Sequence, residues 1–129
     1  MTIHVATSFG EFLDKITILE IKSERISDSD KLQNIHHELT LLKDIWQQHE
    51  KSRINIDQLY ADLKAINEKL WTIEDDIRDK ERSKEFDEEF IQLARSVYIR
   101  NDERAAIKRA INVKLGSDIV EEKSYADYK

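Results

Sequence analysis

The clearest pattern in the chain is an apolar seam between Asn55 and Glu81. Its leucines and isoleucines recur at alternating steps of three and four residues, which places them on one side of an α-helix. The seam consists of Ile56, Leu59, Leu63, Ile66, Leu70, Ile73 and Ile77. This stretch predicts a long helix, over residues 55–82, around which the other helices pack.

Three further helices are predicted from shorter seams. The first, over residues 8–26, begins with the capping pair Ser8 and Glu11. The second, over residues 30–48, follows a polar break and is capped by Asp30. The last, over residues 84–115, ends at Gly116, a typical helix C-cap.

The first helix carries apolar residues on two faces. Phe12, Ile16, Leu19 and Ile26 form one seam, whereas Ile18 and Ile21 lie on the opposite side of the cylinder. Such a helix either lies at the centre of the fold or meets another copy of the chain. The second alternative predicts a homo-oligomer, expected as a dimer.

These elements predict an all-α fold, an antiparallel bundle of about four helices in a single domain over residues 1–129. Two glycines and no proline leave little material for the turns of a β-sandwich or barrel. The termini, residues 1–7 and 117–129, are expected to form short extended arms. Ile119 and Val120 are candidates to pair with Ile3 and Val5.

Composition narrows the setting and the partners. The chain has no cysteine, no signal peptide pattern and no apolar run approaching the ~18 residues of a membrane span, so a soluble cytoplasmic protein is expected. Its net charge of −6 argues against nucleic acid as a general partner.

Charge is distributed unevenly along the chain. Residues 68–89 hold ten acids against five bases, whereas residues 100–114 hold five bases against two acids. A basic strip of this size is typical of a solvated face matched to acidic neighbours, with phosphate binding as the alternative.

The seam of the last helix contains three polar residues. If the helix is unbroken, Asn101, Arg104 and Lys108 face inward together. A break capped by Asn101 or Asp102 would instead rotate apolar residues onto that face. The pattern leaves both alternatives open.

A second set of polar residues is predicted to share one level of the bundle. In antiparallel helices, residues equally far from the connecting turn lie at the same level. With turns near residues 29, 52 and 84, this places Glu20, Glu38, Asn67 and Asn101 at one level. Such a layer either fixes the register of the helices or binds a small polar or anionic ligand.

The ligand alternative gives a set of candidate site residues. Charge, amide groups and an aromatic wall would come from Arg78, Asn101, Arg104, Lys108, Trp71, Asn67 and Lys15. Glu20 and Glu74 are the candidate catalytic acids or bases. The sequence indicates no cofactor and no metal site, and it holds no phosphate loop or nucleophile elbow. Its acid runs at 74–76 and 88–89 leave open magnesium chemistry of the kind that helical nucleotide pyrophosphohydrolases use.

Three long stretches carry a family resemblance. They are SFGEFLDKITILEIKSERI at 8–26, LWTIEDDIRDKE at 70–81 and RNDERAAIKRAINVKLGSDIVEEKSYADY at 100–128. Together they resemble a small uncharacterised family of bacteria and phages, a domain of unknown function. The resemblance implies a compact helical protein and no particular activity. A looser likeness to the all-helical chorismate mutases rests on charged residues that face the interior of long helices.

Two hypotheses for function follow. The leading one is a non-enzymatic, self-associating interaction or assembly module, because continuous seams occur without catalytic signatures. The alternative is an enzyme or binder of a small anionic metabolite, with a charged pocket inside the bundle and chemistry like that of chorismate mutases or magnesium-dependent nucleotide pyrophosphohydrolases.

Overall fold

The structure is a computed structural model that describes residues 1–128. It contains four α-helices: α1 (Phe9–Arg25), α2 (Ser29–Gln48), α3 (Asp57–Arg82) and α4 (Glu88–Leu115). A short 3₁₀ helix, η1 (Glu50–Arg53), joins α2 to α3, and no strand occurs among the described residues. The predicted all-α fold with four helices is confirmed.

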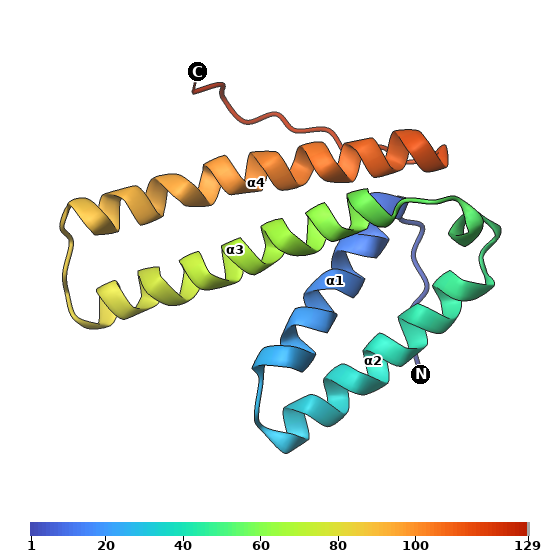
Figure 1. Ribbon diagram of the computed structural model, residues 1–129, viewed down its shortest axis with the longest axis horizontal. Coiled ribbons are helices and arrows are strands. Elements are labelled where there is room, and N and C mark those ends of the chain that lie inside the picture. The colour runs from blue at the N-terminus through green and yellow to red at the C-terminus, as the bar shows by residue number, and fades with distance from the viewer. Residues whose placement is uncertain (129) are drawn as a thin grey trace.

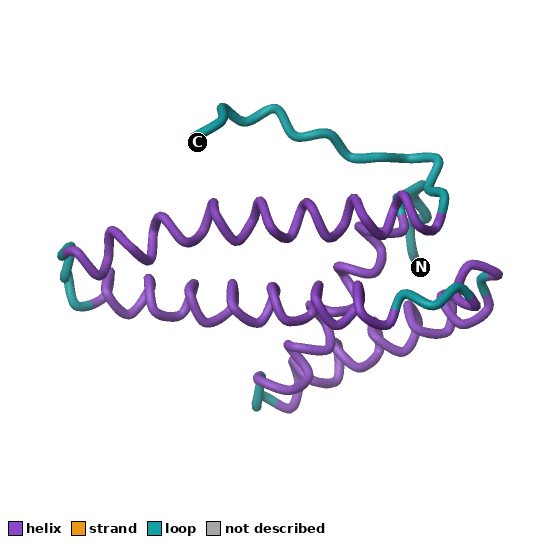
Figure 2. The backbone as a smooth tube through the Cα atoms, turned by 45° about the horizontal axis from the view of Figure 1, so that its top comes forward, coloured by secondary structure: helices purple, strands orange, loops and turns teal. Residues whose placement is uncertain are grey.

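The helices form two antiparallel hairpins that cross at one end. Figure 1 shows the α1–α2 hairpin lying at an angle against the end of the α3–α4 hairpin that contains the start of α3 and the end of α4. Helix α1 contacts each of the other three helices, and α3 contacts α4 most extensively. Residues 71–100, here named the stalk, form the outer part of the α3–α4 hairpin and extend beyond the α1–α2 hairpin (Figures 1 and 2).

The core lies where the hairpins cross. Its buried members are Leu13, Ile16, Ile56, Leu63, Ile66, Ile111 and Leu115. Leu13, Leu63, Ile111 and Leu115 are fully excluded from solvent, whereas the apolar residues of the stalk are at best half-buried. The organising seam of α3 is therefore confirmed, and its burial is concentrated in the half nearest α1.

Helix α1 occupies the central position that its two apolar faces predict. Ile16 and Leu19 are buried on one side, and Ile21 is only 1% exposed on the other. Ile18 and Ile21 contribute to a cleft beside α3 and α4. A central α1 is therefore confirmed, and its association with another copy of the chain stays a prediction.

The starts of α1 and α2 depend on side-chain caps. The Ser8 hydroxyl accepts the amide of Glu11 at 3.1 Å, as predicted, but the Glu11 carboxylate bonds to Lys108 instead of closing a capping box. Asp28 rather than Asp30 caps α2. The Asp28 carboxylate accepts a hydrogen bond from the backbone amide of Lys31 at 3.0 Å, and the helix therefore starts at Ser29.

The turn before α4 is longer than the sequence predicted. Lys84 has φ +56°, a left-handed conformation that cannot begin a helix. Helix α4 therefore begins at Glu88, where the carboxylate of Asp87 accepts the amide of Phe90 at 3.0 Å. At the other end, Gly116 adopts φ +68° and ends the helix as predicted.

Helix α4 is continuous from Glu88 to Leu115, so a break at Asn101 or Asp102 is wrong. Its inward polar face is real: Arg104 contacts Asn67 of α3, and Lys108 contacts Glu11 and Asp14 of α1. Both side chains find hydrogen-bond acceptors on α1 and α3, so the helix does not need to break here.

The C-terminal tail runs back along α4 (Figure 2). Ion pairs join Lys108 to Glu121 and Arg109 to Glu122, each at 3.4 Å. The basic strip of α4 is therefore matched largely by acids of the same chain. The predicted pairing of the tail with the N-terminal arm is wrong, because Ile3 is 90% exposed and the tail contacts α4 instead.

The crossing of α1 and α4 depends on a glycine. A Cβ at Gly10 would lie 2.6 Å from the carbonyl oxygen of Lys108, well inside the van der Waals limit. The Gly10 amide also donates to the side-chain carbonyl of Asn112 at 2.7 Å. The two backbones can approach this closely only because residue 10 has no side chain.

We predict that Gly10→Ala destabilises the protein by about 1–3 kcal/mol, because the new methyl group must push α4 away. This sign is opposite to the gain of about 1 kcal/mol that alanine gives over glycine within a helix. Urea unfolding followed by circular dichroism measures the change. Thr40→Ala, at an exposed position of α2, serves as the control and is expected to change stability by less than about 0.5 kcal/mol. A Gly10→Ala variant as stable as the wild type would contradict the close crossing.

Candidate functional site

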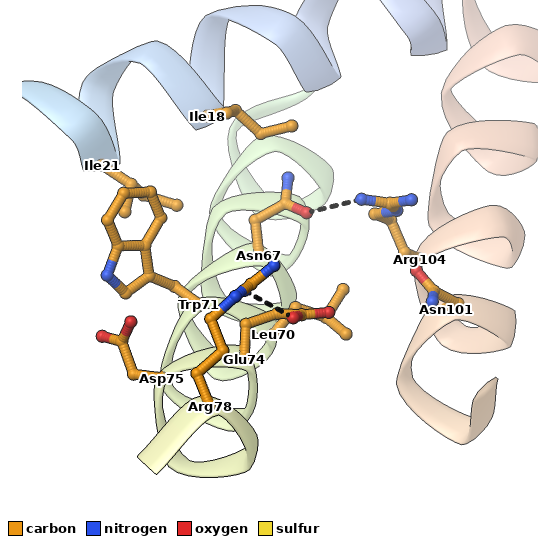
Figure 3. Close-up of a pocket in the computed structure, with 10 residues that line it drawn as sticks. All are labelled: Ile18, Ile21, Asn67, Leu70, Trp71, Glu74, Asp75, Arg78, Asn101 and Arg104. Carbon is orange, nitrogen blue, oxygen red and sulfur yellow. Dashed lines mark hydrogen bonds and ion pairs between the residues drawn. The ribbon is translucent and has the colours of Figure 1, made fainter. Parts of the chain in front are cut away.

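An open cleft of about 460 Å³ lies where α1, α3 and α4 diverge. Figure 3 shows side chains from all three helices around it. The lining residues are Ile18, Ile21, Asn67, Leu70, Trp71, Glu74, Asp75, Arg78, Asn101 and Arg104. The structure thus gathers six of the nine predicted site residues at one place, five of them ligand-binding candidates and one, Glu74, a catalytic candidate.

Asn67 forms the inner wall of the cleft and is only 5% exposed. Its amide nitrogen donates to the Asp14 carboxylate at 2.7 Å and to the Thr17 hydroxyl at 2.9 Å. Its side-chain oxygen accepts from Arg104 at 3.4 Å. Asn67 therefore connects a buried acid on α1 to a cation on α4, and its orientation is fixed from both sides.

Lys108 lies one turn beyond Arg104, outside the cleft. Its ammonium group contacts the Glu11 carboxylate at 2.6 Å, Asp14 at 3.7 Å and Glu121 at 3.4 Å, and its side chain is 12% exposed. Burial alone would lower the pKa of Lys108, but the hydrogen bond to Glu11 and the nearby carboxylates together raise it. Lys108 is thus a charged, internally paired residue of a second groove, between α4 and the tail, which shares Asn101 and Arg104 with the cleft.

Arg104 differs from Lys108 in its partners. It is partly buried, and within the described residues it has no carboxylate within ion-pair distance. A guanidinium carries five N–H donors, and among residues 1–128 the only side chain that accepts from Arg104 is Asn67, at 3.4 Å. Figure 3 shows the group at the edge of the cleft, beside Asn101. The arrangement leaves a cation with donors to spare.

The outer part of the cleft is built on α3. The Trp71 indole lies beside Ile21 and forms an aromatic wall, as Figure 3 shows. Glu74 accepts from Arg78 at 2.8 Å, an ion pair four residues apart on the helix surface. Asp75 lies next to Trp71 on the rim, and in the described part of the chain its carboxylate has no ionic partner. The rim therefore holds one neutralised pair and one unpaired acid.

The remaining candidates lie elsewhere. Lys15 pairs with Glu38 at 2.8 Å on the surface between α1 and α2. Glu20 accepts from the Tyr60 hydroxyl and lies 3.7 Å from Lys43. The four residues predicted to share one level therefore do not form one layer: Asn67 and Asn101 line the cleft, while Glu20 and Glu38 contact other partners.

Tyr60 makes a second, partly buried polar contact between α1 and α3. Burial, together with the hydrogen bond to Glu20 and its negative charge, raises the pKa of the Tyr60 hydroxyl well above its ordinary value. The neutral phenol is the form that the fold requires, because an ionised Tyr60 would face the Glu20 carboxylate.

Sequence reasoning missed Asp14, Thr17 and Asp75. The spacing of Gly10, Asp14, Thr17 and Ile21 on one stripe of the first helix was the available signal, since small and polar residues there mark a close, polar helix contact. Asp75 gives no such signal, because it stands in an acidic run like any solvated face.

Within residues 1–128, no group of three histidines, cysteines or acids is arranged to hold a metal ion. None of the helices described combines the length and the apolar character that a membrane crossing requires.

Comparison with known families gives one match. The model of DUF6165, described as a family of unknown function, matches residues 3–128. The chain belongs to this family. Comparison with curated proteins and with solved structures found no match. The resemblance seen in the sequence is confirmed, and the cleft is a candidate site within the DUF6165 fold.

We predict that Tyr60→Phe lowers stability by about 1 kcal/mol at neutral pH, since Glu20 loses a hydrogen bond. At high pH the difference in stability between the wild type and Tyr60→Phe narrows. The raised pKa of the folded Tyr60 means that its contribution is complete below pH ~10 and is lost as pH rises towards the folded value. The variant has no phenol at this position, so its stability falls less steeply above pH ~10.

Urea unfolding between neutral pH and pH ~11 measures both effects. Tyr125→Phe is the control, because Tyr125 is 86% exposed on the tail and its loss leaves the buried contact intact. Equal slopes for the wild type and Tyr60→Phe would contradict the role assigned to this contact.

Proposed function

We propose that the protein binds a small molecule with an anionic group, which Arg104 holds in the cleft between α1, α3 and α4. The observation that carries the proposal is the partly buried guanidinium without a carboxylate partner. Burying a charge is costly unless it is paired, so a cation left in this state favours an anion from outside the chain.

The neighbours of Arg104 on α4 sharpen the contrast. Arg100 pairs with Glu103 at 2.8 Å, Lys108 with Glu11 at 2.6 Å and Arg109 with Glu122 at 3.4 Å. These three cations are neutralised within the chain, whereas Arg104 faces the cleft. A planar guanidinium can bind a carboxylate or phosphate with two parallel hydrogen bonds.

The cleft has the size and lining of a small-molecule site. About 460 Å³ falls within the range of 300–1,000 Å³ that is usual for ligand pockets. Ile18, Ile21, Leu70 and Trp71 supply apolar surface, and the amide groups of Asn67 and Asn101 supply hydrogen bonds. A ligand with an anionic end and an apolar body fits this division.

The proposal is a binding function rather than catalysis. Glu74 is the one candidate acid in the cleft, and its carboxylate is held by Arg78 on an exposed helix surface.

We predict that carboxylate probes bind the cleft through Arg104. Acetate, caproate, phenylacetate and inorganic phosphate are titrated while the indole N–H signal of Trp71 is followed by NMR. The longer carboxylates are expected to shift this signal saturably. Arg104→Gln is expected to weaken their binding at least about tenfold, because a charge-assisted bidentate contact is lost.

Arg95→Gln is the matched control. Arg95 is an exposed arginine of α4 whose guanidinium bonds only to Gln92 at 3.3 Å, and its loss is expected to leave binding unchanged. The proposal would be contradicted if no probe gave a saturable shift, or if both substitutions weakened the binding of the probes equally.

We propose as a second function that two copies of the chain associate through their stalks. No residue of the stalk, all of which the structure describes, is fully buried. Phe86 is 54% exposed, Ile91 48% and Tyr98 43%. A hairpin of two helices leaves much of its apolar seam in water, and a second hairpin packed against it would complete a four-helix arrangement.

Charge favours an antiparallel pair of stalks. Residues 79–90, at the tip of the stalk, hold six acids against three bases, whereas the rest of the stalk holds three of each, so two tips side by side would repel each other. A two-fold axis that sets each tip beside the base of the partner's stalk keeps the tips apart and buries the same patch on both copies.

We predict that the wild type sediments above its monomer mass of 15.3 kDa at micromolar concentrations, and that Ile91→Lys restores the monomer. Ile45→Lys on α2 is the matched control, because Ile45 is 46% exposed and lies away from the stalk. A wild type that stays monomeric across this range in analytical ultracentrifugation would contradict the second proposal.

A further inference from the structure

We infer that the ligand of the cleft is a zwitterion, with a cationic group opposite its anionic group. The inference rests on the proposed anion-binding function and adds the chemistry of the other end of the ligand. It comes from the charges around the cleft, which are of both signs and lie beside an apolar wall.

The charged side chains of the cleft sum to no net charge. Glu74 and Arg78 neutralise each other at 2.8 Å. This leaves the Arg104 cation and the Asp75 carboxylate as the two unpaired charges among the lining residues that the structure describes. A polyanion such as a nucleotide would meet one available cation and one repelling acid, so a neutral, dipolar molecule matches the site better.

The two unpaired charges lie on different sides of the cleft. Figure 3 shows Arg104 projecting from α4 beside Asn67, and Asp75 on α3 at the far side of the Trp71 indole. Figure 3 draws the ion pair of Glu74 with Arg78 between them, with Ile18, Ile21 and Trp71 above it. The middle part of a ligand that reaches both charges therefore meets apolar side chains on one side, and its cationic end passes the indole, whose face attracts cations.

Asn67 and Asn101 lie at the inner end of the cleft, next to Arg104, and add amide groups to the end that prefers an anion. The oxygen of Asn67 is turned towards Arg104 because its amide nitrogen is used by Asp14 and Thr17. The Arg104 guanidinium is thereby held beside Asn67, at the inner end of the cleft. The inner end consequently selects an anion, and the outer end has a carboxylate that selects an amine.

The ligand class is thus an amino acid in the broad sense: a carboxylate or similar anion and an ammonium group joined by an apolar spacer. Glu74 and Arg78 add no preference for either sign, because each is occupied by the other.

The test compares matched probes with and without an amine. γ-Aminobutyrate, ε-aminocaproate and ω-aminocaprylate are titrated beside butyrate, caproate and caprylate, with the Trp71 indole signal as the readout. The series varies the spacing of the charges, so one length is expected to bind about two- to fivefold more tightly than the acid without the amine, the range of an exposed ion pair.

Two variants assign the effect. Asp75→Asn is expected to abolish the advantage of the amine, so that each amino acid binds this variant no more tightly than the matching simple acid. Asp76→Asn removes the same charge one residue away, at an exposed position that does not line the cleft, and is expected to keep the advantage.

The outcomes separate this inference from the function on which it rests. Simple acids that bind through Arg104 with no gain from an amine at any length would overturn the zwitterion and leave the anion site standing. An advantage that survives in Asp75→Asn would also overturn it. Failure of all six probes to bind would remove both.

Discussion

A buried carboxylate holds the crossing of the two hairpins together. Asp14 is 5% exposed, accepts from Asn67 of α3 at 2.7 Å and lies 3.7 Å from the ammonium of Lys108 on α4. A buried acid is tolerated only when hydrogen bonds and an opposite charge replace the water it has lost. Both partners must therefore be in place at once, which fixes the positions of α3 and α4 relative to α1 more narrowly than apolar packing alone would.

The same requirement explains the composition of α4. Its inward face carries Asn101, Arg104 and Lys108 where a conventional bundle has leucines, because the acids and amides of α1 and α3 lie opposite. Beyond these residues, Ile111 and Leu115 return to the apolar core. The C-terminal part of α4 thus packs in the core, and the middle part of the helix forms a wall of the cleft.

The sequence predicted the elements better than their arrangement. The spacing of Leu63, Ile66 and Leu70 was enough to find α3 and its buried face, because helical periodicity is a local property. The angle between the hairpins depends on contacts far apart in the chain, such as that of Gly10 with Lys108, and local pattern carries no information on it. Glu20 and Glu38 were placed level with Asn67 on the assumption that all helices climb in parallel, and the crossing of the hairpins breaks that assumption.

Part of the site could be predicted for the same reason. Asn67, Asn101 and Arg104 stand at seam positions where polar residues are conspicuous, and they line one cleft. The acids were harder to find. Asp75 is one acid among several on the surface of α3, and only its place beside Trp71 distinguishes it.

The contact at Gly10 also influences the cleft. Gly10 lies against the backbone of α4 at Lys108, and α1 continues from this contact to Ile18 and Ile21 at the cleft. These two residues lie roughly 12–17 Å along the helix from Gly10, at 1.5 Å per residue. A change of about 10° in the angle between α1 and α4 at Gly10 would therefore displace them by roughly 2–3 Å. A larger side chain at position 10 would thus alter the shape of the cleft as well as the stability of the crossing.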